Sequence, residues 1–410
     1  YQQMLDALAE EFGNIPQIGA SVDGMIYPHD MRTDGAALVL CSDPDAKISV
    51  KGARENSATK SAKKLAEQID CKNGVIILHF PLVHVPNVFK SLQFFARGFY
   101  YSRRCKGLDQ NSQKEFARKF ADYCDKEKIF YTQPTTLKIF AEHTKYKIPI
   151  LGINVVHTQM KFNTPNIFCN FKDIEDGIAA LTIEKDGIDV VYDDIFPDKG
   201  NTLEETMYIV RKTFTVVKEF KANFERNVLI SLDDKPPFEA VKNIVGVFKE
   251  SEEKLLNNLE KGDLQVQMPY ILNFFNKKTN GRTHVGFGSY CPFDLFPFFI
   301  DISDYSERIL FAYEPFYGRL HDFISSLSQL KSQDNFNFFC IDVASISAFG
   351  KEVYKLRHDI KNILKQNYFG LLTSAPSVFL PPVYQKRKYM SEIDDNIIYT
   401  SAGSNVCVSI

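Results

Sequence analysis

The sequence predicts a mixed α/β (α+β) protein made of two similar halves, each with a mixed sheet and helices packed on it. The main observation is a repeated phrase, in which a helical pattern is followed by Ile-Pro and then a glycine, at residues 15–20 and again at 148–153. Proline ends the helix and starts an extended run, and glycine lets another backbone or a ligand approach. A weaker third copy at 368–374 keeps the glycine. Repeated helix–strand–glycine units indicate a duplicated fold.

The N-terminal elements follow from their hydrophobic patterns. Apolar runs predict buried strands at 35–40 and 74–80, and alternation predicts a strand at 48–50. Alanine, leucine and isoleucine at helical spacing predict a helix at 57–69. The next segment, 88–131, mixes aromatic and basic residues, and we expect it to form a helical excursion from the core.

The elements after the second glycine strand repeat the same order. Residues 176–183 and 187–192 predict a hairpin around a polar turn. Apolar residues four and three apart predict a helix at 202–224, and Thr202 with Glu205 fits a capping box at its start. This helix closes the first half.

A boundary near residue 225 is predicted before the next strand, at 228–232. It divides the chain into an N-terminal domain, 1–225, and a C-terminal domain, 226–410. The C-terminal elements are expected to be a helix at 239–261, a Phe-rich strand region at 284–314, a helix at 318–331, a strand at 336–343, a helix at 351–366, the third glycine strand, and a strand at 397–410.

The composition excludes functions that need a strongly charged or membrane-spanning chain. A net charge of −2 gives no general attraction to nucleic acid or membranes, and no apolar run reaches the length of a membrane span. The eight cysteines never stand at metal-ligand spacing, which indicates reduced thiols and an intracellular, cytoplasmic protein. The chain begins at Tyr1 inside a helical pattern, so we expect a preceding segment, and a targeting peptide to an organelle stays open.

The sequence contains no phosphate-binding loop, dinucleotide fingerprint, zinc-protease motif or nucleophile elbow. His79 and His84 stand on either side of Pro81 at the end of a predicted strand, and His157 follows the second glycine strand; the three could form a metal or acid/base site. Their spacing provides no carboxylate partner, so buried structural histidines are the favoured interpretation. We therefore predict no catalytic residue, no metal ligand and no cofactor.

The segment 88–131 carries the main local charge. Residues 90–128 contain ten Lys/Arg and five Asp/Glu, interleaved with aromatic residues. One interpretation is a helical hairpin with a solvated basic face, and the other is a docking surface for an acidic protein, RNA or anionic lipid. The residues predicted to contact a partner are Arg97, Phe99, Tyr100, Arg103, Arg104 and Arg118.

The order of these units resembles the FIST domain, a sensory or substrate-binding module of bacterial signalling proteins and eukaryotic F-box proteins. The family pattern is a helix, a Pro-x-hydrophobic-Gly strand and a small-residue run. Residues 16–26 are similar to it: Gly19, Ser21 and Gly24 match, while Met25 replaces an acid.

The resemblance continues into the C-terminal half. Residues 230–238 look like the Asp-Gly-x-Pro-Ala start of that half, and 338–340 resemble its Phe-Ser-Cys strand. Residues 370–373 resemble its terminal Gly-Phe-Tyr-Thr motif, whereas 375–377 depart from the Gly-Glu-Ile that follows. Only 88–131 falls outside the match.

The resemblance implies a non-catalytic binding protein. It could act as a small-ligand sensor in signal transduction, as an F-box-type adaptor in the ubiquitin pathway, or as a scaffold subunit of a larger complex. The alternative is an enzyme on a duplicated α/β scaffold, using a histidine or Cys340. Gly19 and Gly152 are expected at equivalent places near one cleft, and the predicted ligand-binding residues are Gly19, Ser21, Gly24, Gly152, Asn154, Gly370 and Thr373.

Overall fold

The computed structural model describes most of the 410-residue chain. The residues that it leaves undescribed are 14, 33–34, 82, 85–86, 132, 156–165, 194–199, 238, 242–269, 287–294, 298–300, 314–315, 329, 331–334, 343–352, 366, 374–375, 382–397 and 401–404.

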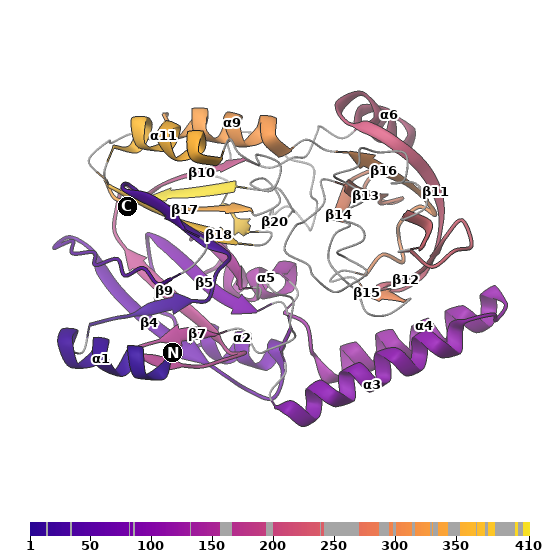
Figure 1. The fold of residues 1–410 in the computed structure, drawn as a ribbon, viewed down its shortest axis with the longest axis horizontal. Coiled ribbons are helices and arrows are strands. Elements are labelled where there is room, and N and C mark those ends of the chain that lie inside the picture. Colours follow the sequence, from indigo (N-terminus) through magenta and orange to yellow (C-terminus); the bar gives the residue numbers. More distant parts are fainter. Residues whose placement is uncertain are drawn as a thin grey trace.

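Two six-stranded mixed sheets form the centre of the molecule (Figure 1). The first sheet has the order β20 (Ile398–Thr400), β19 (Ser377–Phe379), β6 (Ile150–Val155), β5 (Val75–Pro81), β9 (Ile178–Glu184) and β4 (Lys47–Ala53). The second sheet has the order β3 (Asp30–Arg32), β2 (Gly24–Tyr27), β18 (Tyr368–Thr373), β17 (Asn337–Asp342), β21 (Asn405–Ser409) and β10 (Asp189–Asp193).

The two sheets have the same plan. Each contains one parallel pair, β5 with β6 and β17 with β18. An antiparallel hairpin flanks one side of the pair, and two antiparallel strands flank the other. The predicted α+β fold class is therefore confirmed.

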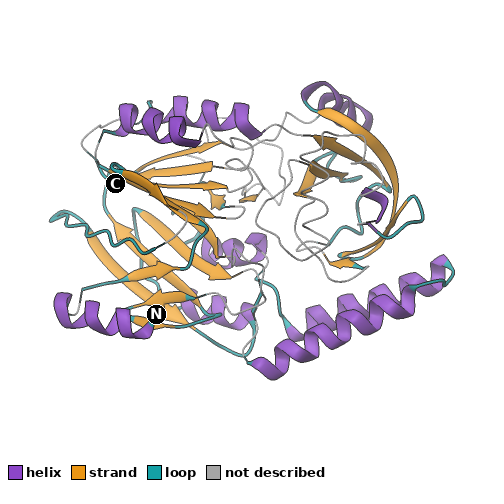
Figure 2. Cartoon of the chain, in the orientation of Figure 1, coloured by secondary structure: helices purple, strands orange, loops and turns teal. Residues whose placement is uncertain are grey.

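Helices cover the outer faces of both sheets, so that the core has four layers (Figures 1 and 2). Apolar residues of both sheets pack between them, including Ile77, Leu151, Val190 and Val406. The outer face of the first sheet is covered by α2 (Ala58–Ala66) and α5 (Gln133–His143), and that of the second by α9 (Phe316–Leu327) and α11 (Val353–Leu364). Strand β5 is buried along its whole length, as is typical of a strand covered on both faces.

A small sheet closes one side of this core. It has the order β1 (Ile18–Ala20), β7 (Ile167–Cys169) and β8 (Lys172–Asp173), and α1 (Gln2–Phe12) lies beside it. Ile167 and Cys169 pack on Val50 and Ala179 of the first sheet. Strand β1 leads directly into β2, so the small sheet positions the loop at residues 21–23.

An antiparallel third sheet forms a separate lobe. Its order is β14 (Arg282–Gly286), β13 (Tyr270–Phe275), β16 (Arg308–Tyr313), β11 (Thr215–Glu225), β12 (Val228–Leu232) and β15 (Phe296–Pro297). One helix that packs on this sheet is α6 (Leu203–Thr213). The segment 88–131 forms the helical hairpin α3 (Val88–Cys105) and α4 (Gln110–Glu127), which also packs on this sheet.

Four predictions for the first half are wrong. Residues 35–40 form no strand, because they have no partner strand and are exposed. The segments at 176–192 are not a hairpin: β9 and β10 lie in different sheets, since β5 and β4 occupy both sides of β9. The helix at 202–224 ends at Thr213 and continues as β11, where the β-branched Thr215, Val216 and Val217 favour a strand.

The fourth correction concerns the repeats. Gly19 lies in β1 of the small sheet, opposite Phe168. Gly152 and Gly370 are the equivalent pair, each the third residue of the second strand of a parallel pair. The domain boundary near residue 225 stays a prediction. It does not divide the strands between the two central sheets, since β2 and β3 belong to the second sheet and β19 and β20 to the first.

One prediction for the second half is also wrong: the segment 397–410 contributes two strands, β20 in the first sheet and β21 in the second. The other predicted elements agree with the structure where it describes the chain. The predicted strands at 74–80, 228–232 and 336–343 correspond to β5, β12 and β17. The capping box at the start of α6 is present, with Thr202 accepting from the Glu205 backbone N–H at 3.2 Å. Most of the helix predicted at 239–261 lies outside the described residues.

Candidate functional site

The carboxyl ends of the two parallel pairs meet between the central sheets. Thr373, the last residue of β18, donates a hydrogen bond from its hydroxyl to the main-chain oxygen of Asn154 in β6. Both residues are buried. Two of the predicted ligand-binding residues from distant parts of the sequence are thus brought into contact.

The loop between β1 and β2 lies against the same strand ends. Its Asp23 donates a main-chain hydrogen bond to the Leu372 oxygen at 3.0 Å, and Gly24 pairs with Leu372. Ser21 is held by Asn166, with a main-chain hydrogen bond of 2.9 Å. Gly24 therefore lies on the strand that pairs with β18, close to Thr373, whereas the hydrogen bonds of Ser21 are with Asn166.

Two acids face this region. Asp342, which is fully buried, ends β17 and pairs in register with Thr373. Asp23 is largely buried, and that burial, together with the negative charge of Asp342, raises the pKa of its carboxyl to about 7. An acid with this pKa exchanges its proton near neutral pH, and in a polar cluster it indicates a functional site.

Two further buried polar side chains lie in the first sheet. His79 in β5 is 4% exposed, and burial lowers its pKa to about 4, while a hydrogen bond to the Gly19 backbone opposes that shift. Its Nδ1 atom and the Oδ1 atom of Asn154 have no hydrogen-bond partner among the residues that the structure describes. Asn154 pairs in register with Phe80, which packs on the helix-covered outer face of that sheet. We call Asp23, Asp342 and Thr373, with the main-chain oxygen of Asn154, the polar cluster.

The electrostatic character of the polar cluster is that of an acceptor-rich interior. Asp23 and Asp342 are both acids, and the negative charge of Asp342 disfavours ionisation of Asp23. A group that donates hydrogen bonds or carries positive charge is favoured beside two such carboxyls.

The predicted glycines serve packing. At Gly370 a Cβ would overlap the ring of Phe339, and at Gly152 it would overlap the Ser377 hydroxyl and approach Phe80. A Cβ at Gly19 would come within 3.1 Å of Phe168. Their missing side chains therefore make room for neighbouring protein atoms.

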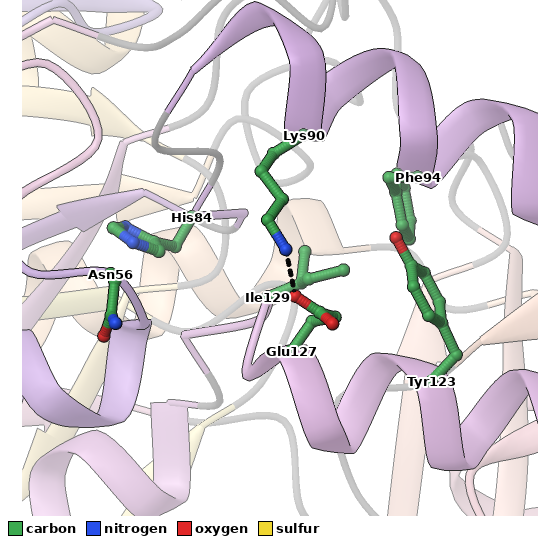
Figure 3. A pocket seen from close by; sticks show the side chains of 7 residues that line it. All are labelled: Asn56, His84, Lys90, Phe94, Tyr123, Glu127 and Ile129. Atoms are coloured by element: carbon green, nitrogen blue, oxygen red, sulfur yellow. Dashed lines mark hydrogen bonds and ion pairs between the residues drawn. The ribbon is translucent and has the colours of Figure 1, made fainter.

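A small pocket lies where the first sheet joins the α3–α4 hairpin (Figure 3). Lys90 forms an ion pair with Glu127 across it, with His84 and Asn56 on one side and Phe94 and Tyr123 on the other. This pocket is separate from the polar cluster in sequence and in fold.

His84 is held firmly behind that pocket. Its Nδ1 lies 2.9 Å from the carboxylate of Asp176 and 3.0 Å from the main-chain oxygen of the same residue. Arg54 pairs with Asp176 and Glu175, at 2.6 Å each. The carboxylate partner that the histidine spacing did not reveal is therefore Asp176, while His157 lies outside the described residues.

The predicted partner residues divide into two groups. Arg97, Phe99, Tyr100, Arg103 and Arg104 are exposed on α3. Arg118 lies on α4 and pairs with Glu225 of β11 at 2.7 Å, so it joins the hairpin to the third sheet. The aromatic residues of the hairpin that face inward are buried, among them Phe94, Tyr101 and Phe120.

Sequence reasoning missed Asp23 and Asp342 as site residues. A usable signal existed for Asp342, because a carboxylate directly after a buried hydrophobic strand lies at the strand's carboxyl end, where ligands bind in α/β folds. Asp23 carried no such signal, since its burial depends on β2 joining a strand from the far end of the chain.

The described residues contain no cluster of three or more metal-ligating side chains. Seven described cysteines are free, and Cys340 is fully buried, which raises the pKa of its thiol well above the ordinary value. Within the described part of the chain, no helix is both long and apolar enough to cross a membrane.

Comparison with known proteins places the chain in a family. An uncharacterized protein of Archaeoglobus fulgidus is 24% identical over 391 residues, which cover 95% of this chain and 99% of that protein. The family model of the AF0772-like protein C-terminal domain matches residues 204–317, a range that includes α6 except its first residue and all six strands of the third sheet. The FIST N domain model matches residues 1–235, more than half of the chain. The chain therefore belongs to the FIST family, whose domains are in general sensory and ligand-binding.

Proposed function

We propose that this FIST-family protein binds a small polar ligand at the polar cluster. The observation that carries the proposal is the acid pair at the strand ends. Asp23 is bonded through its main chain to Leu372, and Asp342 pairs in register with the next residue, Thr373, so the charge of Asp342 raises the pKa of Asp23. Such a pair is costly in an empty interior. A bound ligand that neutralises it offsets that cost.

The chemistry of the cluster favours a ligand with an ammonium or guanidinium group. A cation between the two carboxylates replaces repulsion with attraction, and its N–H groups supply hydrogen-bond donors for the carboxylate oxygens. Thr373 then serves to hold the two strand ends in place through its bond to Asn154. Binding of such a cation lowers the pKa of Asp23, so the site releases a proton when it fills near neutral pH.

The test is calorimetric titration of the full chain with small primary amines and guanidines, against matched alcohols and carboxylates. Amine or guanidine binding is expected to weaken at least tenfold in Asp342→Asn and to stay unchanged in Asp45→Asn, which alters an exposed acid. Repeating the titration at pH 6.5 in buffers of different ionisation enthalpy measures the proton release. Binding of carboxylates alone, or no proton release, would contradict the proposal.

A second candidate function, protein docking, rests on the exposed side of α3. Val88 is 77% exposed, Phe89 75% and Leu92 64%, and a monomer rarely leaves such side chains together in water. An adaptor and a subunit of a larger assembly would both use this surface. Substitutions test it better than deletion of the hairpin, because deletion uncovers Val228 and Ile230 of the third sheet.

The enzyme alternative through Cys340 finds no support in its surroundings. Thiolate chemistry needs an accessible sulfur with a lowered pKa, and burial acts on Cys340 in the opposite direction. We expect iodoacetamide to leave Cys340 unmodified in the native protein at pH 8, while the exposed Cys41 reacts. Mass spectrometry of the digested protein distinguishes the two.

A further inference from the structure

One side of α3 carries exposed apolar and basic residues. We call it the outer face, and it consists of Val88, Phe89, Leu92, Phe99 and Tyr100 with Arg97, Arg103 and Arg104. The five apolar members are 43–77% exposed. Because residues 88, 92 and 99 are four and seven apart, they lie along one side of the helix, with 89 and 100 beside them. The opposite side of α3 packs on α4 and β12 through Phe94, Tyr101 and Cys105. The fold therefore uses one side of α3 and leaves the other to solvent.

The charge of the hairpin is concentrated on this helix. Between Val88 and Cys105 the sequence has four basic residues and no acidic residue, whereas α4 has four of each. Lys90 is paired with Glu127, but no ion pair involves Arg97, Arg103 or Arg104 among the residues described. The guanidinium of Arg104 lies 5.7 Å from the centre of the Tyr100 ring, an arrangement that keeps it on the apolar row.

We infer that the partner of the outer face is an acidic amphipathic helix laid along α3. This inference rests on the docking function proposed above and adds the chemistry of the partner. The apolar row on α3 is complemented by a row of apolar side chains along one side of a partner helix. The flanking arginines are complemented by carboxylates on that partner. The row extends from Val88 to Tyr100, which along a helix is about 18 Å and matches about three turns of a partner.

Two other classes of partner fit less well. Nucleic acid is held through many phosphate contacts, and the outer face offers three arginines on a chain of net charge −2. An anionic membrane would be attracted by the same three arginines only, and it would be repelled by the chain's net negative charge. A protein helix needs only the local complementarity that the outer face provides.

The experiment selects binders from a displayed library of 16-residue amphipathic peptides whose polar positions vary among Glu, Gln and Lys, using the full chain as bait. Selected peptides are expected to be rich in Glu. Phe89→Ser with Leu92→Ser should weaken the best peptide at least tenfold, and Arg103→Glu with Arg104→Glu about tenfold at 50 mM salt and less at 500 mM. The matched control is Tyr208→Ser, an aromatic residue 56% exposed on α6.

Each outcome decides a different point. Selection of neutral or basic peptides that still depend on Phe89 and Leu92 would overturn the acidic partner and leave the docking function standing. Peptides that bind equally to the Phe89/Leu92 variant would overturn both, as would tighter binding to phosphatidylserine vesicles or to poly(U) than to any peptide. Circular dichroism of each variant should match the unmodified protein, because the substituted side chains point to solvent.

Discussion

At the scale of single residues, Asp23 of the polar cluster and His79 of β5 respond to pH in opposite directions. Burial raises the pKa of the Asp23 carboxyl and lowers that of the His79 imidazole, since it disfavours the charged form of each. Between about pH 4 and pH 6.5 the two effects on stability oppose each other. The pH dependence of stability that each group causes therefore becomes visible when the other group is substituted.

Asp23→Asn is expected to stabilise the protein above pH 7. The folded-state pKa of Asp23 is about 7 and its ordinary value is 3.8, so between these values the folded chain retains a proton that the unfolded chain has released. The free energy of unfolding therefore falls as pH rises through this window. The variant does not show this decrease, because asparagine has no proton to release. The gain should be on the order of 2 kcal/mol at pH 8 and vanish near pH 4 in urea titrations. An equal gain at both pH values would contradict this assignment.

His79→Asn should flatten the acid side of the stability curve. The folded-state pKa of His79 is about 4 and its ordinary value is 6.5, so on acidification the unfolded chain takes up a proton first. Stability is thereby lost as pH falls from 6.5 to 4, by on the order of 2 kcal/mol for the unmodified protein relative to the variant. The measurement is urea unfolding at pH 4.5 and 7.5. His143→Asn, which changes an exposed histidine away from the cluster, is the control.

Gly370→Ala tests the packing role of the equivalent glycines. The added Cβ overlaps the Phe339 ring inside the second sheet, so a backbone or ring shift must follow. We expect a loss of about 2–3 kcal/mol in the free energy of unfolding. Gly107→Ala places its Cβ in open space at a φ of +74°, and backbone strain alone should cost about 1 kcal/mol. A smaller loss at 370 than at 107 would show that Phe339 adapts easily.

At the scale of elements, the α3–α4 hairpin shows how one amphipathic segment serves two surfaces. Its inward aromatic residues form a cluster with β12, in which Phe120 lies between Phe94 and Tyr101 with ring centres 6.4 and 5.6 Å away. Asp109 caps α4 by accepting from the Ser112 backbone N–H at 3.1 Å. The hairpin is thus fixed from within, and its outward side chains are available without cost to the fold.

Phe120→Ala and Phe89→Ala separate these two surfaces. Phe120 is fully buried, and its truncation leaves a cavity that should cost about 3–4 kcal/mol. Phe89 is 75% exposed, so its truncation should change stability by less than about 0.5 kcal/mol. Guanidinium unfolding of both variants measures the difference. Equal losses would mean that the outer face is packed in solution.

At the scale of the whole molecule, the sequence predicted units better than it predicted their pairing. Buried strands such as β5 and β17 were found because continuous apolar runs are determined locally. The incorrect hairpin at 176–192 and the incorrect repeat at Gly19 have one cause. Which strands pair depends on how the whole sheet assembles, and a local sequence pattern does not contain that information.

The same limit applied to the candidate site. Asn154 and Thr373 were predicted from their glycine strands, and their contact confirms that those strands meet. Asp23 gains its buried acid partner only through pairing of β2 with β18. Distant pairing therefore decides which side chains share an interior.

The two central sheets each contain a strand pair from the far end of the chain: β2 and β3 belong to the second sheet, and β19 and β20 to the first. This arrangement has a consequence for biosynthesis. Strands β2 and β3 emerge from the ribosome early, but β18, to which they pair, is among the last strands made. At usual elongation rates the interval is roughly 20–70 s. Throughout it, β2 and β3 present unpaired backbone, and the first sheet waits for β19 with an open edge at β6. Nascent chains of this protein should consequently depend on chaperone protection until translation is nearly complete.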